Sequence, residues 1–262
     1  MVNQNMMRII MTSFNSNLIA SPNLRTLRKE EKQYLILRFL REVLWSRQDI
    51  LQQVMKLESR QSTHKSLKQM ESHGLIKPHT FSALGGKLKL WGITQHGQSL
   101  AFDIKSEMPY SAYFQPSRIS EQLIRHQLDL QWLRINAEAH GWTKWQDGDR
   151  MGQLSKSTKR PDAIVLNSAG MKVGVECERS FKTQKRYEQI LLSYLRLIKN
   201  QTVNEVVWVC PTQDFTERLE IQIKLIKQLR VAGQTVKIDS EKHHKHIYFC
   251  SYIDWPNYHE SD

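Results

Sequence analysis

Two short apolar runs joined by a turn restrict the fold of this chain more than any other feature of its sequence. Residues 163–166 (AIVL) and 172–177 (KVGVEC) have the length and composition of strands, and small turn-forming residues at 168–170 separate them. Such a pair of runs predicts an antiparallel hairpin. One acidic residue precedes the first run and two stand at the end of the second, so we expect the hairpin to gather carboxylates at one end.

Strand geometry predicts how these carboxylates are arranged. Successive side chains point to opposite faces, which places Glu176 and Glu178 on one face and Cys177 on the other, with Asp162 beside the two glutamates. Three converging carboxylates form a hard oxygen site that suits Mg²⁺ or Mn²⁺. Such an ion polarises a phosphodiester, lowers the pKa of bound water and stabilises the departing oxygen. A solvated acidic pair is the plainer interpretation, but the residues before these glutamates are apolar.

A cluster of carboxylates needs positive charge nearby, because mutual repulsion would otherwise raise its pKa values and weaken metal binding. The flanking sequence supplies five basic side chains that can also hold phosphate oxygens: Arg160, Arg179, Lys182, Lys185 and Arg186. The second half of the chain is therefore expected to carry phosphodiester chemistry.

Helix and strand signals alternate through the rest of this half. Periodicity predicts a helix over 119–140, a strand over 142–145, the hairpin, a helix over 183–199 and a strand over 205–210. A helix over 216–231 and terminal strands at 235–238 and 246–250 complete the expected order αβββαβαββ.

The first hundred residues predict three helices and a hairpin. The helices are expected over 27–45, 47–57 and 60–72, the last of them stopping at Gly74. Gly85-Gly86 is a turn, residues 87–93 alternate as a strand, and Thr94 caps a helix that runs through Phe102. Three helices followed by a two-stranded hairpin fit a winged helix-turn-helix.

The third of these helices is expected to face DNA. Thr63, Leu67 and Met70 fall on one face and would pack inward. The outward side chains are basic or amides, which suit phosphate contact and base-edge reading: Arg60, Gln61, Lys65, Lys68 and Gln69. Lys87 and Lys89 stand where a wing would touch the DNA backbone.

The distribution of charge favours DNA as the partner. The formal net charge is +12; residues 1–100 hold 15 Lys and Arg against 6 Asp and Glu, whereas residues 101–262 hold 23 against 20. The surplus therefore lies in the half expected to be the winged helix. The three separated cysteines are expected to be buried thiols. No apolar run is long enough for a secretory or membrane segment, which predicts a cytoplasmic protein without a membrane partner.

These signals predict an α/β (α+β) chain with two domains. We expect a polar, flexible N-terminal arm at 1–24, a winged-helix DNA-binding domain at 25–106, a linker with two prolines at 107–117 and a nuclease-like domain at 118–262.

The second half resembles the PD-(D/E)xK nuclease group, whose restriction-endonuclease-like fold has an αβββαβ core. Asp162 matches the Asp of its Pro-Asp motif and Glu176 matches its Glu. Glu178 departs from the pattern, because the group has Lys there to position or activate water. The resemblance implies that a lysine of the following helix takes this role, with Lys182 the first candidate and Lys185 the second.

Two residues of the preceding helix have open interpretations. Glu121 is either an additional metal ligand, as in some members of the nuclease group, or an acid that favours a helix start. His126 either turns toward the carboxylates or is a partly buried, hydrogen-bonded histidine. Trp142 and Trp145 are interpreted as core, with stacking on an unpaired base as the alternative.

Three motifs together resemble the narrower replication-relaxation family, which includes the MobC-type relaxases of mobilisable plasmids. They are RPDA at 160–163, ECERS at 176–180 and KTQKRYEQ at 182–189, and the resemblance spans about residues 27–210. It implies that the chain nicks DNA at a plasmid transfer or replication origin without tyrosine chemistry, together with other mobilisation or relaxosome proteins. His244 and His246 have the spacing of the HxH motif of tyrosine relaxases, but Lys245 between them favours a solvated basic tail.

The sequence therefore predicts a DNA endonuclease dependent on Mg²⁺ or Mn²⁺, with Asp162, Glu176 and Glu178 at the metal. Arg160 is expected to contact DNA. One open alternative is a non-catalytic DNA-binding accessory protein of replication or mobilisation with a degenerate nuclease fold. Another is a winged-helix transcription regulator whose second domain binds an effector.

Overall fold

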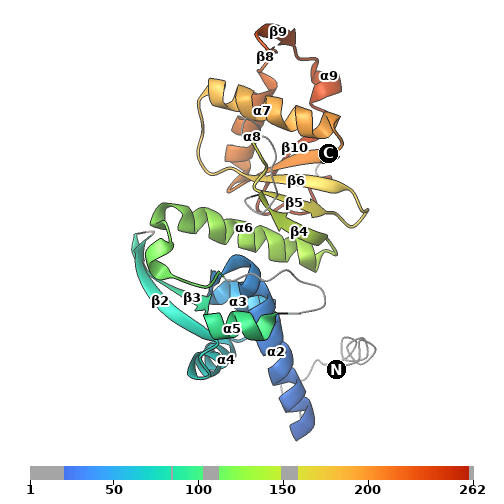
Figure 1. The fold of residues 1–262 in the computed structure, drawn as a ribbon. Helices are drawn as coiled ribbons and strands as arrows, with labels where there is room; N and C mark the ends of the chain where they lie inside the picture. Colours follow the sequence, from blue (N-terminus) through green and yellow to red (C-terminus); the bar gives the residue numbers. More distant parts are fainter. Residues whose placement is uncertain (1–20, 84, 103–111, 149–158, 260–262) are drawn as a thin grey trace. The chain divides into compact units, whose positions relative to one another are not determined.

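A computed structural model describes residues 21–83, 85–102, 112–148 and 159–259 (Figure 1). The described residues form a mixed α/β structure, which confirms the coarse fold class expected from the sequence. The chain divides into two compact units. Unit 1 comprises the described residues of 1–79 and 89–114, and unit 2 those of 80–88 and 115–262.

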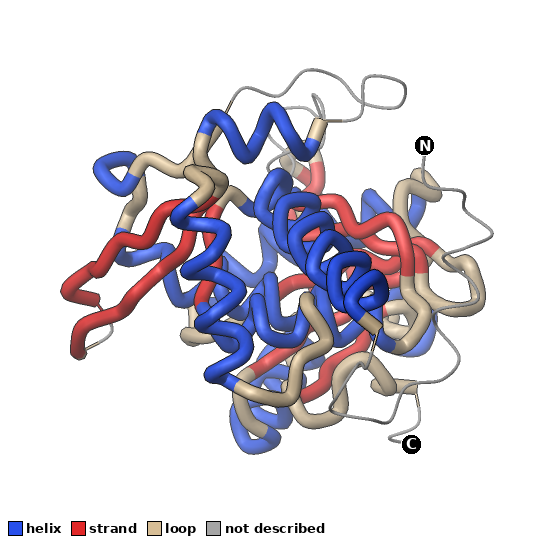
Figure 2. The backbone as a smooth tube through the Cα atoms, turned by 90° about the horizontal axis from the view of Figure 1, so that it is seen from below, coloured by secondary structure: helices blue, strands red, loops and turns tan. Residues whose placement is uncertain are grey.

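Unit 1 contains four helices and most of a small sheet. The helices are α2 (Pro22–Val43), α3 (Gln48–Val54), α4 (Arg60–Ser72) and α5 (Gln95–Ala101). The strands are β1 (Trp45–Arg47), β2 (Ile76–Ala83) and β3 (Gly86–Ile93), in the order β1-β3-β2. Strands β2 and β3 form a long hairpin, whose arms Figure 2 shows in red with a grey tip.

The first helix differs from its expected bounds at both ends. It begins at Pro22, five residues earlier than predicted, and proline is favoured in the first helical turn because its missing N–H needs no partner there. It ends at Val43 because Leu44 adopts a left-handed φ of 68°. Trp45 then leaves the helix and pairs with Gly92 in antiparallel β1–β3. The sequence analysis had placed Trp45 in the helix, which was wrong.

Helix α4 has the predicted bounds, and its faces are as expected. Thr63, Leu67 and Met70 are buried, whereas Arg60, Gln61, Lys65, Lys68 and Gln69 are all exposed. The side chain of Ser59 caps the helix by accepting from the backbone N–H of Ser62. Thr94 likewise caps α5 by accepting from the N–H of Gly97, as predicted.

Unit 2 is built on a five-stranded sheet in the order β10-β7-β6-β5-β4. After a 3-10 turn at Pro116–Arg118, its elements are α6 (Glu121–Ala139), β4 (Thr143–Asp147), β5 (Ala163–Leu166), β6 (Lys172–Cys177), α7 (Gln184–Lys199), β7 (Glu205–Cys210), α8 (Gln213–Lys224) and β10 (Ile247–Ser251). The pairs β4–β5 and β5–β6 are antiparallel, and β6–β7 and β7–β10 are parallel.

A separate hydrophobic cluster covers each face of this sheet. On one face, Val206, Trp208 and Cys210 of β7 pack with residues of α7 and α8. On the other face, Val207 and Val209 pack with α6 and with the C-terminal aromatics Trp255 and Tyr258. This alternation along β7 shows that the strand is buried on both sides, as a parallel strand usually is.

The segment after β7 differs from the sequence analysis. The predicted helix over 216–231 ends at Lys224, and β8 (Gln228–Val231) pairs with β9 (Gln234–Lys237) in a hairpin outside the main sheet. A short helix, α9 (Ser240–His243), precedes β10, which begins at Ile247. His244 and His246 therefore lie outside the strand on which an HxH interpretation would need them.

None of the helices in the described ranges has the length and apolar character needed to cross a membrane.

Candidate active site

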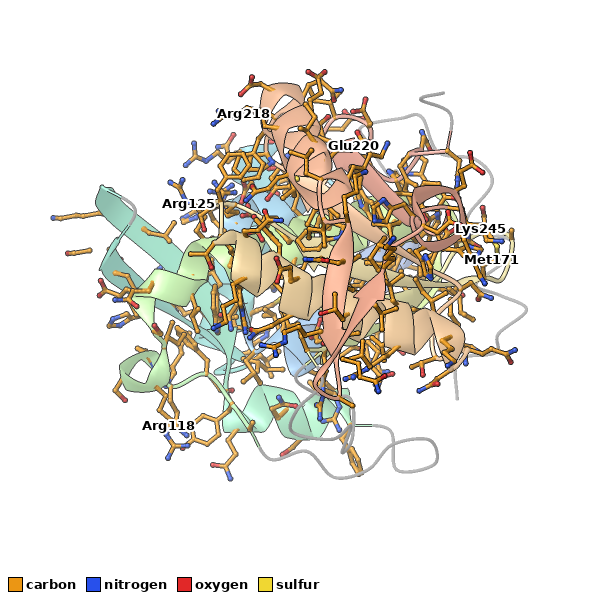
Figure 3. All side chains as sticks on the ribbon, turned by 90° about the horizontal axis from the view of Figure 1, so that it is seen from above. Arg118, Arg125, Met171, Arg218, Glu220 and Lys245 are labelled. Carbon is orange, nitrogen blue, oxygen red and sulfur yellow. The ribbon has the colours of Figure 1, made fainter. Side chains whose placement is uncertain are left out.

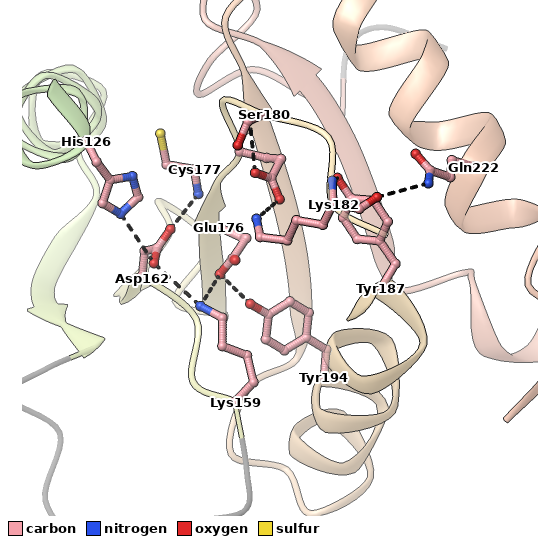
Figure 4. A network of polar contacts seen from close by, with 11 residues as sticks. His126, Lys159, Asp162, Glu176, Cys177, Ser180, Lys182, Tyr187, Tyr194 and Gln222 are labelled. Carbon is pink, nitrogen blue, oxygen red and sulfur yellow. Dashed lines mark hydrogen bonds and ion pairs between the residues drawn. The ribbon is translucent and has the colours of Figure 1, made fainter. Parts of the chain in front are cut away.

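The carboxylate of Asp162 is fixed at the start of β5 by main-chain contacts. Its Oδ2 accepts a 2.9 Å hydrogen bond from the backbone N–H of Cys177 on the neighbouring strand β6 (Figure 4). Its own carbonyl accepts from the N–H of Gly148 at 2.8 Å. A Cβ on Gly148 would lie 2.3 Å from the carbonyl oxygen of Pro161, so only glycine allows this close approach.

Glu176 lies one strand away from Asp162, near the end of β6, and is almost completely buried. Its relative exposure is 2 %. Tyr194 of helix α7 donates a hydrogen bond to Glu176 Oε2. Cys177 belongs to the hydrophobic cluster on the α6 side of the sheet, so consecutive residues of β6 point to opposite faces, as the strand pattern predicted.

Lys159 joins the two carboxylates. Its Nζ lies 3.2 Å from Glu176 Oε2 and 3.7 Å from Asp162 Oδ1, as Figure 4 shows. Lys159 was not among the residues expected in the site. The available signal was a basic side chain three positions before Asp162, whereas the missing lysine was expected only after Glu178.

His126 of helix α6 reaches the same carboxylate from the other side. Its Nε2 lies 3.5 Å from Asp162 Oδ1, and its side chain is 32 % exposed. Both interpretations left open by the sequence therefore describe one arrangement: a partly buried histidine that is turned toward the candidate carboxylates.

Glu178 is paired separately from the other two carboxylates. Lys182 donates to its Oε2, and the backbone N–H of Ser180 donates to its Oε1 at 3.4 Å. The loop that carries Lys182 is tied to both neighbouring helices, because its N–H donates to Tyr187 Oη and its carbonyl accepts from Gln222 Nε2. Lys182 thus neutralises Glu178, and the pair borders the site where Lys159 bridges Asp162 and Glu176.

The pKa shifts reflect how crowded this acidic pair is. Burial, and then the charge of Asp162, raise the pKa of Glu176 to about 7. Burial also acts to raise the pKa of Asp162, but its bond with His126 and the charge of Lys159 outweigh this and lower it. The two carboxyl groups therefore have opposite shifts, a pattern that is common where acid–base chemistry takes place.

The shifts of the two basic partners agree with this picture. The pKa of His126 is raised, chiefly by its hydrogen bond with Asp162. The pKa of Lys159 is lowered by burial but raised more by the charges of Glu176 and Asp162. Both groups therefore hold their protons more tightly than they would in water.

Four other predicted residues lie farther out. Lys185 is exposed in the first turn of α7, and Glu121 is exposed in the first turn of α6. Arg160 is half-buried and its Nη1 donates to the carbonyl of Gly148 at 3.5 Å. Arg186 is exposed, and its charge is felt by Lys159. In the ranges described, no hydrogen bond or ion pair joins Lys185 or Glu121 to the three carboxylates.

Arg179 stabilises the helix that carries His126. Its Nη1 donates to Asp129 Oδ2 at 2.5 Å and to Tyr252 Oη at 3.2 Å, and Tyr252 Oη also contacts Cys177 Sγ at 3.2 Å. Asp129 is three residues after His126, on the same side of α6. This network therefore joins the helix to the ends of β6 and β10.

The tryptophans considered for base stacking are explained by packing. Trp142 is buried and makes edge contacts with Trp255 and Tyr258. Trp145 is half-buried and its Nε1 donates to Asp147 Oδ1 at 2.9 Å.

Asp162 and Glu176 are the residues that could hold a divalent ion. They offer hard carboxylate oxygens from two adjacent strands, and Mg²⁺ is often bound by one or two carboxylates with water and substrate phosphate completing its shell. Over the described ranges, no group of three or more His, Cys, Asp or Glu side chains is arranged to hold a metal.

Comparison with protein families, with curated proteins and with solved structures gave no match to this chain. The chemistry of the site is therefore inferred from its own residues.

Proposed function

We propose that this chain is a DNA-binding, metal-dependent endonuclease of the relaxase-like kind, which nicks DNA at a plasmid transfer or replication origin. One observation carries the proposal: Asp162 and Glu176, from adjacent strands, converge on the ammonium group of Lys159. Two carboxylates and a lysine at one end of a sheet are the set that PD-(D/E)xK nucleases use.

The order of elements in unit 2 supports the same proposal. Helix α6, strands β4, β5 and β6, helix α7 and strand β7 follow one another as αβββαβ. The site lies at the start of β5 and the end of β6, where the motifs of that nuclease group would place it. Lys159 would then take the role of the lysine that Glu178 replaces.

Each residue of the site has a definable part in cleavage. Asp162 and Glu176 would hold Mg²⁺ or Mn²⁺, which when bound supplies positive charge to the phosphate and lowers the pKa of water. Lys159 provides a further positive charge beside the scissile phosphate. His126 holds the orientation of Asp162 through their ion pair. Lys185 and Arg186, both exposed, could hold phosphate oxygens, and Lys182 could do so if it exchanged its partner Glu178 for a phosphate.

Unit 1 would select the DNA. The exposed face of α4 carries basic and amide side chains, and Lys89 on β3 is exposed. Lys87, exposed on the same strand, falls within unit 2. A helix for the major groove beside a basic hairpin is the arrangement of a winged helix-turn-helix. The large surplus of positive charge in the first hundred residues supports this assignment.

A second function is favoured by one specific observation. Lys159 lies within ion-pair distance of both carboxylates, so the trio is also compatible with a purely structural ion-pair cluster. On this alternative the chain is a non-catalytic DNA-binding protein that recruits a replication or mobilisation partner to an origin.

A nicking assay separates the two functions. Supercoiled origin-bearing DNA is incubated with the wild-type protein and Mg²⁺ or Mn²⁺, and the relaxed product is followed. The endonuclease proposal expects relaxation that requires the metal and falls by at least about 100-fold in Asp162→Asn and in Glu176→Gln. Glu138→Gln, an exposed acid on the same unit, is the matched control and is expected to nick normally.

The recruiter alternative predicts a different set of results. Wild type, Asp162→Asn and Glu176→Gln would all leave the plasmid supercoiled and would bind origin DNA equally well. Thermal unfolding of each variant is measured alongside, so that loss of the fold is not mistaken for loss of chemistry.

A further inference from the structure

An exposed aromatic side chain stands on the loop that borders the candidate site. Phe181 follows Ser180 in the segment between β6 and α7 and is 39 % exposed. Its neighbour Lys182 pairs with Glu178, and the charge of Lys182 is felt by Glu176. The exposed ring is therefore part of the border of the site.

Phe181 is held in place by two side chains of helix α8. Its ring stacks on Phe215, with ring centroids 4.2 Å apart and an interplanar angle of 17°. The guanidinium carbon of Arg218 lies 4.9 Å from the centre of the same ring. A hydrogen bond from Gln222 to the carbonyl of Lys182 ties the loop to α8. The two rings and the guanidinium group thus form one ordered stack.

The outer surface of this stack remains accessible to solvent. The side chain of Arg218 is 64 % exposed, and Figure 3 shows it on the outer side of α8. Exposed aromatic rings and planar guanidinium groups are the surfaces on which unpaired bases stack.

The charges around the stack favour nucleic acid over an acidic or apolar protein partner. Lys182 and Lys185 follow Phe181 in the same stretch of chain, and Lys185 is exposed. Two of the three acids of α8 are in ion pairs: Asp214 lies 3.5 Å from Arg218, and Glu220 lies 2.5 Å from Lys224. A phosphate backbone that passes the lysines would bring its bases within reach of the ring.

We propose that Phe181, Phe215 and Arg218 form a subsite that stacks one unpaired base of a single-stranded segment of DNA next to the candidate active site. The inference rests on the proposed function, because it takes DNA as the ligand. It goes further by assigning a single-stranded segment to unit 2, with stacking that does not depend on the identity of the base.

The test compares single-stranded and duplex DNA without cleavage. A fluorescently labelled 20-nucleotide oligo-dT and a 20-base-pair duplex are titrated with full-length protein in EDTA, and anisotropy gives each Kd. Phe181→Ala is expected to weaken oligo-dT binding by about 5- to 100-fold and to leave duplex binding unchanged. Phe181→Trp is expected to keep wild-type affinity for the single strand, because it restores an aromatic face.

Two further variants separate stacking from charge and from surface change in general. Arg218→Lys keeps the positive charge without the planar group and is expected to weaken only oligo-dT binding. Ile253→Ala removes another exposed apolar side chain of unit 2, which is 91 % exposed, and is expected to have no effect.

Several outcomes would overturn the subsite. They are a wild-type protein that binds the duplex but not oligo-dT, a Phe181→Ala variant with unchanged oligo-dT affinity, or an equal loss on both ligands. Failure of the proposed function looks different, because a protein without nuclease activity would leave plasmid DNA supercoiled while still showing the stacking-dependent binding. A protein that binds neither ligand overturns both proposals.

Discussion

The ammonium group of Lys159 lies 3.2 Å from Glu176 Oε2 and 3.7 Å from Asp162 Oδ1, and thereby stands between the two carboxylates. Burial and the neighbouring negative charge outweigh the cation, so the pKa of Glu176 is raised to about 7 from its ordinary value of 4.5. The free energy of unfolding should therefore depend on pH, because a group whose pKa is raised on folding binds its proton more tightly in the folded state.

Glu176→Gln should therefore remove a pH dependence. In the wild type, the favourable contribution of protonated Glu176 is complete below about pH 4.5 and is lost as the pH rises through about 7. Relative to wild type, the glutamine variant should gain stability between these pH values. Urea unfolding at a series of pH values measures the difference, with Glu138→Gln, whose side chain is 42 % exposed, as the surface control. A flat difference for Glu176→Gln would contradict the assigned shift.

The His126–Asp162 pair gives a second titration. The pKa of His126 is raised by Asp162, so the contribution of the ion pair is complete below the ordinary value of 6.5 and is lost as the pH rises through the folded pKa. Asp162→Asn should lower the pKa of His126, as read from its imidazole NMR signals. The signals of His140, exposed at the far end of α6, serve as an internal reference in the same spectra. An unchanged His126 titration would show that the pair does not form.

Gly92→Ala should destabilise unit 1. A Cβ at this position would lie 1.9 Å from Cγ of the buried Phe114, whose backbone N–H donates to the carbonyl of Ile93. Overpacking of this kind costs about 1–3 kcal/mol. Chemical denaturation measures the loss. Gly86→Ala is the matched control on the same strand, because nothing lies within 4 Å of its Cβ position.

Gly148→Ala should displace the backbone that carries Asp162. The added Cβ meets the carbonyl oxygen of Pro161, the residue directly before Asp162. We expect a loss of about 1–3 kcal/mol in stability, and a lower pKa for His126 because Asp162 moves. Ser168→Ala, in the exposed turn between β5 and β6, should change neither quantity. If His126 titrates normally in Gly148→Ala, the close approach does not set the position of Asp162.

Lys65→Ala should weaken duplex DNA binding if α4 enters the major groove. The loss should be similar for all sequences, and the slope of log K against log salt should become shallower by about one unit. Lys29→Ala, which removes an exposed cation from α2, should leave the slope unchanged. An equal effect of both substitutions would indicate general attraction rather than contact through α4.

The sequence was most informative where local signals and burial agree. Strands β5, β6 and β7 and helix α4 have the predicted bounds, because apolar alternation, caps and glycine turns all point to the same limits. The sequence-based prediction failed where contacts with another segment determine the secondary structure. Residues 228–231 continue a helical pattern of apolar residues, yet they pair with β9 because a turn at Ala232 and Gly233, both with positive φ, brings the two strands together.

The site shows the same division. Strand alternation placed Glu176 and Cys177 on opposite faces of the sheet and allowed Asp162 to lie beside Glu176. These relations could be predicted because they depend on a single hairpin. The position of Lys159 could not be read in this way, because Lys159 lies outside the strands and its side chain contacts Glu176 of β6, 17 positions later in the sequence. The separate pairing of Glu178 with Lys182 was also hidden, since it depends on how the loop after β6 turns toward α8.

The anchor of Asp162 is the main-chain N–H of Cys177, which every residue except proline would supply at position 177. The hydrogen-bond donor for this aspartate is therefore provided by the pairing of β5 with β6. A variant of this chain with a neutral residue in place of Asp162 would still have the backbone N–H donor of Cys177. A later mutation back to aspartate would therefore restore the hydrogen bond. Loss of the acid would in this respect be reversible, whereas a slip in the pairing of β5 and β6 would not.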